Sequence, residues 1–245
     1  MPVSKNFTSQ FSQDWEINFL QCYPNGKLKY TDLCSIFQLT AASHAALGGI
    51  SFTDMQEFNQ AWVLSKMIVE IKKLPCWNDV ITVTTWIKSL ENSRSVRCLE
   101  VYLNGEKIIG CETFWVVFNT SSRRPENLML PEAHFEKFPL KNATTKTFSR
   151  IENIENSTIA GTKKIVLSDL DIVNHANSVK YLEWCLDYLD TTVSISTTIK
   201  SFEMNYLKEL ALNDVVTIEE YTTNDCVFFK VIKDTKTSFV LKLNL

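Results

Sequence analysis

Residues 167–190, LSDLDIVNHANSVKYLEWCLDYLD, are the stretch around which we interpret the whole chain. A strand is expected just before it, over residues 162–167, and an amphipathic helix over its second part, 178–190. The loop between them carries three polar residues, Asp171, Asn174 and His175. Polar side chains on a loop between two ordered elements are held by a rigid scaffold, which favours a functional site at this place.

The helix expected over 178–190 is apolar on most of its surface. Asn177 is suited to be its N-cap, because an Asn side-chain oxygen can accept a hydrogen bond from a free N–H group of the first turn. One face is entirely aliphatic, with Val179, Leu182, Leu186 and Leu189. Such a helix is stable only when other elements surround it, so we expect a sheet to wrap it.

Composition sets broad limits on the protein class. The chain has 245 residues, of which 45% are hydrophobic and 22% charged, as in a globular protein of one large or two small domains. A net charge of −3 gives no overall attraction to nucleic acid. The first ten residues lack the apolar core of a signal peptide, and no apolar run reaches membrane-spanning length. We therefore expect a cytoplasmic protein without membrane insertion.

Seven cysteines are scattered along the chain without a CxxC pair, and only three histidines are present. In a cytoplasmic protein these cysteines are expected to be reduced thiols that pack as small apolar residues. No histidine lies near a pair of cysteines, so we expect neither a metal site nor a cofactor.

The first half reads as a strand, a turn, a helix, a loop and four long strands. The hairpin between the last two strands has Asn104-Gly105 at its turn, where both residues tolerate positive φ. The expected elements are a strand around 15–19, a turn at 24–26, a helix at 31–47, a loop at 50–59 and strands at 61–74, 80–90, 94–103 and 107–118.

Residues 121–150 contain three prolines and no clear period, so we expect a linker, which we place at 123–158 between units 1–122 and 159–245. The second half repeats the order of the first: after the strand, loop and helix described above come strands at 198–206, 215–222, 226–233 and 238–243.

A short string also repeats. NDVITV at 78–83 returns as NDVVTI at 213–218, an offset of 135 residues (213 − 78), at the same point of the two element orders. This favours an internal duplication. An apolar helix and one long antiparallel sheet bury each other only if the sheet curls around the helix. The prediction is an α+β tandem (double) hotdog, with two long central helices each wrapped by a curved antiparallel sheet.

The chain resembles the acyl-acyl carrier protein (acyl-ACP) thioesterases, double-hotdog enzymes found in plants and some bacteria, and bacterial members in particular. In the first half the resemblance is carried by Gln38, His44, WVLS at 62–65, PCW at 75–77, TW at 85–86, Trp115 and RP at 124–125. In the second half it is carried by DLD at 169–171, HAN at 175–177, VKY at 179–181, Trp184 and YLKE at 206–209. It implies an acyl-chain pocket in the first unit and catalytic residues in the second.

Two positions depart from the family pattern. The family reads Asp-x-Asn-x-His in the loop, whereas here Val173 stands at the place of the Asn, and Asn174 follows one residue later. Plant members carry a Cys directly after the Glu, and here that residue is Leu210. Covalent catalysis by a thiol at this position is therefore excluded, and direct attack by water is the simpler mechanism.

Thioester hydrolysis needs an activated water, a stabilised oxyanion and a protonated leaving thiol. We expect Glu209 and His175 to activate the water, and Asp171 to organise the loop and act as their electrostatic partner. Asn174 is expected to turn inward and replace the amide missing at Val173. The roles of the two carboxylates are exchangeable at this point, and Asp171 and Glu209 are also consistent with a turn residue and a solvated surface residue.

For substrate binding the resemblance points to residues on and after the first helix and at the start of the second: Gln38, His44, Trp62 and Asn177. Structural alternatives exist for three of them. A histidine near a helix end beside small residues is commonly a packed core residue, a tryptophan first of all fills a core, and Asn177 is explained as an N-cap.

Three functions remain open from the sequence. The first is hydrolysis of fatty acyl-ACP to free fatty acid, with the carrier's 4′-phosphopantetheine-linked acyl chain as substrate. The second is hydrolysis of acyl-CoA, and the third is acyl binding without hydrolysis, suggested by Val173. An acidic carrier would need local basic residues, of which the nearest in the sequence are Arg123, Arg124, Lys163 and Lys164. These four residues are equally consistent with solvated surface charges that have no role in docking. A homodimer is compatible with the sequence but is not indicated by it.

Overall fold

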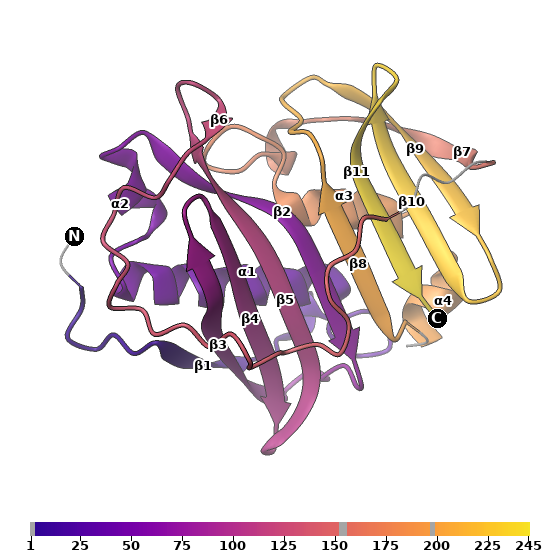
Figure 1. Ribbon diagram of the computed structural model, residues 1–245. Helices are drawn as coiled ribbons and strands as arrows, with labels where there is room; N and C mark the ends of the chain where they lie inside the picture. The colour runs from indigo at the N-terminus through magenta and orange to yellow at the C-terminus, as the bar shows by residue number, and fades with distance from the viewer. Residues whose placement is uncertain (1–2, 152–155, 197–198) are drawn as a thin grey trace. The chain divides into compact units, whose positions relative to one another are not determined.

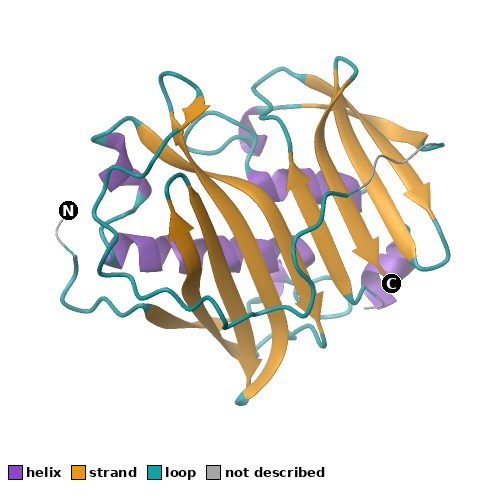
Figure 2. Ribbon diagram, viewed as in Figure 1, coloured by secondary structure: helices purple, strands orange, loops and turns teal. Residues whose placement is uncertain are grey.

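The computed structural model describes residues 3–151, 156–196 and 199–245 (Figure 1). These residues form two compact units. The first consists of residues up to 65 together with 72–146, and the second of residues 66–71 together with those from 147 onward. Each unit has one long helix against an antiparallel sheet, which is the hotdog arrangement expected from the sequence (Figure 2).

In the first unit the strands follow the order β1-β3-β4-β5-β2, and β6 pairs with β5. Neighbouring strands from β1 to β5 run antiparallel. The elements are β1 (Gln10–Glu16), α1 (Tyr30–Leu47), α2 (Phe52–Gln56), β2 (Gln60–Ile71), β3 (Val80–Glu91), β4 (Arg94–Leu103), β5 (Glu106–Asn119) and β6 (Arg124–Pro125).

In the second unit residues 66–70 of β2 pair antiparallel with β8, and β11, β10, β9 and β7 follow in that order. All these neighbours are antiparallel. The elements are β7 (Thr158–Lys164), α3 (Ser178–Leu186), α4 (Thr191–Ser196), β8 (Ser201–Tyr206), β9 (Val215–Thr222), β10 (Cys226–Lys233) and β11 (Lys236–Asn244).

Five sequence expectations need correction. The strand expected at 61–74 is β2, which ends at Ile71. The strand expected at 15–19 ends at Glu16, and Phe19–Gln21 form a 3₁₀ turn because the Asn18 side chain accepts from the Leu20 N–H. The strand expected at 162–167 is β7, Thr158–Lys164. The helix expected at 178–190 ends at Leu186, and α4 begins after Asp190, whose carboxylate accepts from the Thr192 N–H at 2.8 Å. The loop expected at 50–59 contains α2.

One further expectation is tested only in part. The start of the strand expected at 198–206 lies outside the described residues, and the described strand is β8, Ser201–Tyr206.

Within the part of the chain that is described, no helix is both long and apolar enough to cross a membrane.

The segment predicted as a linker packs closely on the first unit. Phe135 is buried and lies in a core cluster with Ala45 and Ile50. The carbonyl oxygen of Ala143 passes so close to Gly110 that a Cβ at residue 110 would lie 2.0 Å from it. Residues 126–146 therefore contribute to the interior of the first unit although they form few regular elements.

The two units repeat the same backbone hydrogen bonds, which supports the internal duplication. Ile17 exchanges bonds with Asn78 and Asp79, and Ile165 exchanges the same bonds with Asn213 and Asp214. Asn78 and Asn213 both adopt the left-handed conformation, with φ of 68° and 69°. The repeated Asn-Asp string thus marks one shared turn, in which an Asn tolerates positive φ and the following Asp carboxylate caps the turn.

Candidate active site

The loop at 170–176 is a tight turn closed by its own backbone. The N–H of Asp171 donates to the carbonyl of His175 at 2.8 Å, and the N–H of Asn174 donates to the carbonyl of Asp171 at 3.1 Å. Asn174 has a φ of 65°, in the left-handed region that Asn tolerates better than most residues. The loop therefore turns the chain sharply and places His175 shortly before the start of α3.

The Asp171 side chain stabilises this turn from inside. Its Oδ1 accepts hydrogen bonds from the N–H groups of Val173 at 3.0 Å and His175 at 3.1 Å. This is the geometry of an Asx turn extended by a second donor. Through these two contacts the Asp171 carboxylate binds the backbone of its own loop.

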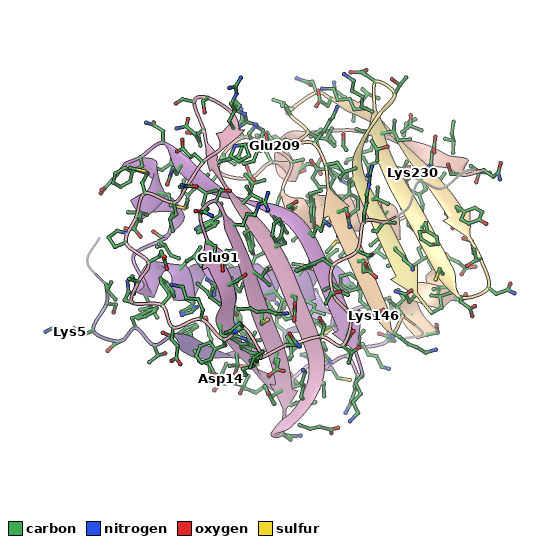
Figure 3. All side chains as sticks on the ribbon, viewed as in Figure 1. Lys5, Asp14, Glu91, Lys146, Glu209 and Lys230 are labelled. Atoms are coloured by element: carbon green, nitrogen blue, oxygen red, sulfur yellow. The ribbon has the colours of Figure 1, made fainter. Side chains whose placement is uncertain are left out.

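One backbone bond connects the loop to the chain segment after β8. The N–H of Ala176 donates to the carbonyl of Leu210 at 2.8 Å. Since His175 and Glu209 each precede a member of this pair, the bond brings their side chains together. His175 Nε2 lies 3.6 Å from Glu209 Oε2. Glu209 lies beyond the end of β8 (Figure 3).

Both side chains of this pair are accessible to solvent, His175 with 26% and Glu209 with 32% of its side-chain surface exposed. A separation of 3.6 Å is longer than a direct hydrogen bond, so modest rotations of the two side chains can accommodate either a direct contact or a bridging water. An accessible imidazole beside a carboxylate is a combination that can take a proton from water near neutral pH.

A buried carboxylate to which the sequence assigned no role supports the loop. Asp169 is buried, and its Oδ2 accepts from the Val166 N–H at 2.9 Å. Its Oδ1 accepts from Trp184 Nε1 of α3 at 3.3 Å, and Lys163 Nζ lies 3.4 Å from Oδ2. Asp169 thus ties β7, the loop and α3 together. The motif DLD shows two Asp residues in the sequence, but only the tertiary contacts distinguish the role of Asp169 from that of Asp171.

The two residues of the family departure differ in their environments. Val173 is half-buried, whereas Asn174 is exposed. Among the described residues, none forms a hydrogen bond with the side-chain amide of Asn174. In this structure Asn174 therefore contributes to the loop through its backbone conformation. Asn177 caps α3, since its Oδ1 accepts from the Val179 N–H at 2.9 Å.

Three predicted substrate-binding residues belong to the first unit. The first, His44, is fully buried between the stacked rings of Phe7 and Phe11. Its Nδ1 accepts from Arg97 at 2.7 Å, and its Nε2 donates to the Thr8 carbonyl at 2.9 Å. Burial, and secondarily the Arg97 charge, lowers the pKa of His44 to about 3. This supports the packed-histidine alternative.

The other two, Trp62 and Gln38, are less enclosed. Trp62 is half-buried beside the core cluster that contains Phe135, and its Nε1 donates to the Ile50 carbonyl at 3.2 Å. Gln38 lies on α1 and is also half-buried. Both side chains therefore keep some accessible surface within the first unit.

The first unit contains the same turn without the reactive side chains. The N–H of Tyr23 donates to the Lys27 carbonyl, and the N–H of Leu28 donates to that of Pro75, as Asp171 does to His175 and Ala176 to Leu210. By this register Lys27 corresponds to His175. One residue before Pro75, the buried Leu74 corresponds to Glu209. The pair of His175 and Glu209 thus has no counterpart at the equivalent positions of the first unit.

Comparisons with known proteins agree with this architecture. The acyl-ACP thioesterase N-terminal domain model matches residues 8–133, and the C-terminal domain model matches residues 151–244. The chain is 24% identical over 220 residues to the chloroplastic dodecanoyl-[acyl-carrier-protein] hydrolase of Cinnamomum camphora, covering 84% of this chain and 58% of that protein. It is 25% identical over 212 residues to the chloroplastic oleoyl-acyl carrier protein thioesterase 1 of Arabidopsis thaliana, covering 79% and 58%. The chain thus spans a little over half of the length of these curated relatives.

Solved structures share the fold over nearly the whole chain. An acyl-ACP thioesterase from Bacteroides thetaiotaomicron superposes with a TM-score of 0.88 at 22% identity, covering 96% of this chain and 97% of that one. The 12:0-ACP thioesterase from Umbellularia californica gives 0.81 at 19% identity, covering 97% of both chains. Together with the two domain models, which match most of the sequence, these findings show that the chain belongs to the acyl-ACP thioesterase family.

Proposed function

We propose that this protein hydrolyses the thioester of a fatty acyl chain carried by an acyl carrier protein, releasing the free fatty acid and the carrier thiol. The observation that carries the proposal is the pair His175 and Glu209, with Nε2 and Oε2 3.6 Å apart and both side chains accessible. Family membership supports the same reaction.

In the proposed mechanism Glu209 and His175 activate a water molecule between them. The water oxygen attacks the thioester carbonyl carbon while its proton passes to the pair. The resulting tetrahedral intermediate expels the thiolate as the C–S bond breaks, and the proton held by the pair goes to the departing sulfur. An imidazole with an adjacent carboxylate suits both transfers, because its protonated form is stabilised by the neighbouring negative charge.

Asp171 and Asn174 shape the loop in this proposal. Oδ1 of Asp171 accepts from two backbone N–H groups of the loop, which supports an organising role for this carboxylate and leaves proton transfer to Glu209. Asn174 contributes its left-handed backbone conformation. The side chain of Leu210 offers no nucleophile and is buried, so water is the attacking group in place of a covalent enzyme thiol.

We assign acyl-chain binding to the first unit, with Gln38 and Trp62 as the candidates for contact because both keep accessible surface. In this account His44 has a structural role: it donates to the Thr8 carbonyl and accepts from the buried Arg97. All seven cysteines are free thiols, which supports a reducing compartment such as the cytoplasm.

Acyl-CoA hydrolysis is the alternative that uses the same catalytic groups, and acyl binding without hydrolysis is the third. The test is to present the protein with a carrier protein and with CoA bearing the same acyl chain, and to measure thiol release from each. We expect a higher kcat/KM with the carrier substrate. A higher value with acyl-CoA would favour the alternative, and no release from either would favour the binding function.

A further inference from the structure

We propose that Tyr181 is a positioning residue that fixes Glu209 against His175, acting through the backbone N–H of Leu210. The inference rests on the proposed hydrolysis at this pair and assigns an additional residue to it. Tyr181 lies on α3, in its first turn, while Glu209 lies beyond the end of β8.

Both backbone polar groups of Leu210 are bound by the chain segment that carries His175 and α3. Its carbonyl accepts from the Ala176 N–H at 2.8 Å, and its N–H donates to the Tyr181 hydroxyl at 3.1 Å. Together the two hydrogen bonds fix the position and the orientation of the Leu210 backbone. With the Ala176 bond alone, the backbone of Leu210 could still rotate about that bond. Because Glu209 directly precedes Leu210, the hydroxyl of Tyr181 determines where the carboxylate points.

The surroundings make the Tyr181 hydroxyl a fixed acceptor. Tyr181 is buried, and its ring packs against Trp184, Tyr206 and Phe239 at centroid distances of 5.2, 5.7 and 5.3 Å. Burial raises the pKa of Tyr181 far above neutral, so the group stays a neutral hydroxyl at working pH. Leu210 is 1% exposed, and water is therefore poorly placed to replace the hydroxyl as acceptor.

The duplicated turn of the first unit provides an internal comparison. Counting from the residues that begin the two helices, Leu33 corresponds to Tyr181, and Pro75 corresponds to Leu210. Leucine has no hydroxyl and proline has no N–H, so this copy lacks both the acceptor and the donor. It also lacks the reactive pair, having Lys27 and Leu74 in those places. The turn itself forms in both units, so folding of the turn does not require the Tyr181 bond. The bond is present only in the copy of the turn in which a carboxylate, that of Glu209, has to be oriented toward a histidine.

The test compares Tyr181→Phe with Tyr206→Phe. Both remove one hydroxyl from the same aromatic cluster, but the Tyr206 hydroxyl donates to the Ser178 carbonyl at 3.1 Å, whereas that of Tyr181 accepts from Leu210. We expect Tyr181→Phe to lower kcat roughly 10- to 100-fold with KM within about twofold, because small displacements of a catalytic group are costly. Tyr206→Phe should keep kcat within about threefold of wild type.

A second comparison separates positioning from general stability. In a Glu209→Gln background, where the carboxylate is already lost, Tyr181→Phe should cause less than about a twofold further loss of kcat. A full multiplicative loss would show that Tyr181 acts elsewhere and would overturn the proposal, as would wild-type kcat in Tyr181→Phe alone. If Glu209→Gln itself keeps wild-type activity, the failure lies in the proposed catalytic pair.

One measurement does not depend on the folding of any variant. In the wild-type protein, the amide of Leu210 should exchange with solvent more slowly than that of Leu212, a nearby residue that is 43% exposed. Exchange at Leu210 as fast as at Leu212 would show that the hydrogen bond to Tyr181 does not persist in solution, and it would overturn the proposal.

Discussion

Asp171 and His175 are joined twice in the loop: the Asp171 N–H donates to the His175 carbonyl at 2.8 Å, and Asp171 Oδ1 accepts from the His175 N–H at 3.1 Å. The carboxylate of Asp171 thus acts on the backbone of His175. An Asn at position 171 has an amide oxygen that can accept the same hydrogen bonds without the negative charge. Replacing Asp171 by Asn therefore distinguishes the effect of its charge from the effect of its hydrogen bonds.

The first prediction compares Asp171→Asn with Asp171→Ala. Asp171→Asn keeps the acceptor, so we expect its kcat to stay within about tenfold of wild type. Asp171→Ala leaves two backbone N–H groups without their acceptor and should lose roughly 1–3 kcal/mol of unfolding free energy, together with a larger fraction of kcat. Steady-state kinetics and urea unfolding measure the two effects. If Asp171→Asn is as inactive as Asp171→Ala, the negative charge itself is needed.

The second prediction concerns Asn174. Its φ of 65° favours Asn and Gly over Ala. Asn174→Gly should keep both stability and turnover, and Asn174→Ala should lose about 1 kcal/mol of unfolding free energy with kcat within about threefold of wild type. Urea unfolding and steady-state kinetics check both variants. A large fall of kcat in Asn174→Gly would instead show that the side-chain amide takes part in the reaction.

The third prediction is a pH dependence of stability that comes from His44. Its pKa is about 3 in the folded protein, against an ordinary value of 6.5. Below pH 6.5 the imidazole is therefore protonated in the unfolded chain but stays neutral in the folded protein. The contribution of His44 to the unfolding free energy is complete above pH 6.5 and is lost as the pH falls toward 3. Between pH 7 and pH 5 the loss should be about 2 kcal/mol.

Urea unfolding of wild type and His44→Gln at these two pH values isolates the contribution of His44, since all other titrating groups are common to both proteins. The variant should be less stable at pH 7 and should show a smaller loss at pH 5. Equal losses in the two proteins would contradict the depressed pKa of the buried imidazole.

The fourth prediction concerns Lys163 and Lys164, two of the basic residues that an acidic carrier could contact. Lys164 is exposed, whereas Lys163 lies 3.4 Å from the buried carboxylate of Asp169. Lys164→Glu should raise KM for the carrier substrate at low salt and have less effect at high salt, because exposed charges are screened. KM for acyl-CoA serves as the control. An unchanged KM for the carrier at low ionic strength would argue against Lys164 as a contact.

Lys163→Glu should act mainly on stability. It would place a second carboxylate next to Asp169 and remove the cation that accompanies it, at a cost of roughly 1–3 kcal/mol of unfolding free energy. Lys163 is therefore a poor probe of docking, and the structure separates two residues that the sequence could treat only as one basic pair.

Much of the architecture was predictable because it depends on local patterns. The alternation of apolar residues located the long strands, Asn104-Gly105 located a hairpin, and the repeated Asn-Asp string marked the duplication. The errors occur where side chains compete locally for backbone groups. Asn18 starts a 3₁₀ turn, and Asp190 begins a new helix where the apolar pattern indicated one continuous helix.

The candidate site was predictable only in part. His175 and Glu209 could be named from the loop and from the family resemblance, but their contact depends on a backbone bond between Ala176 and Leu210, 34 positions apart (210 − 176). Asp169 and Tyr181 gain their roles from contacts with Trp184 and Leu210 that no local pattern specifies. The burial of His44 between Phe7 and Phe11 likewise depends on how the N-terminal segment packs.

The central claim is that His175 and Glu209 act together to activate water, and the most direct test is kcat for a fatty acyl-carrier substrate in His175→Ala, Glu209→Gln and the double variant. Each single change should lower kcat by about 10²-fold or more. The double variant should be little worse than either single one, because the two groups serve one proton transfer. Turnover near that of wild type in both single variants would contradict the account.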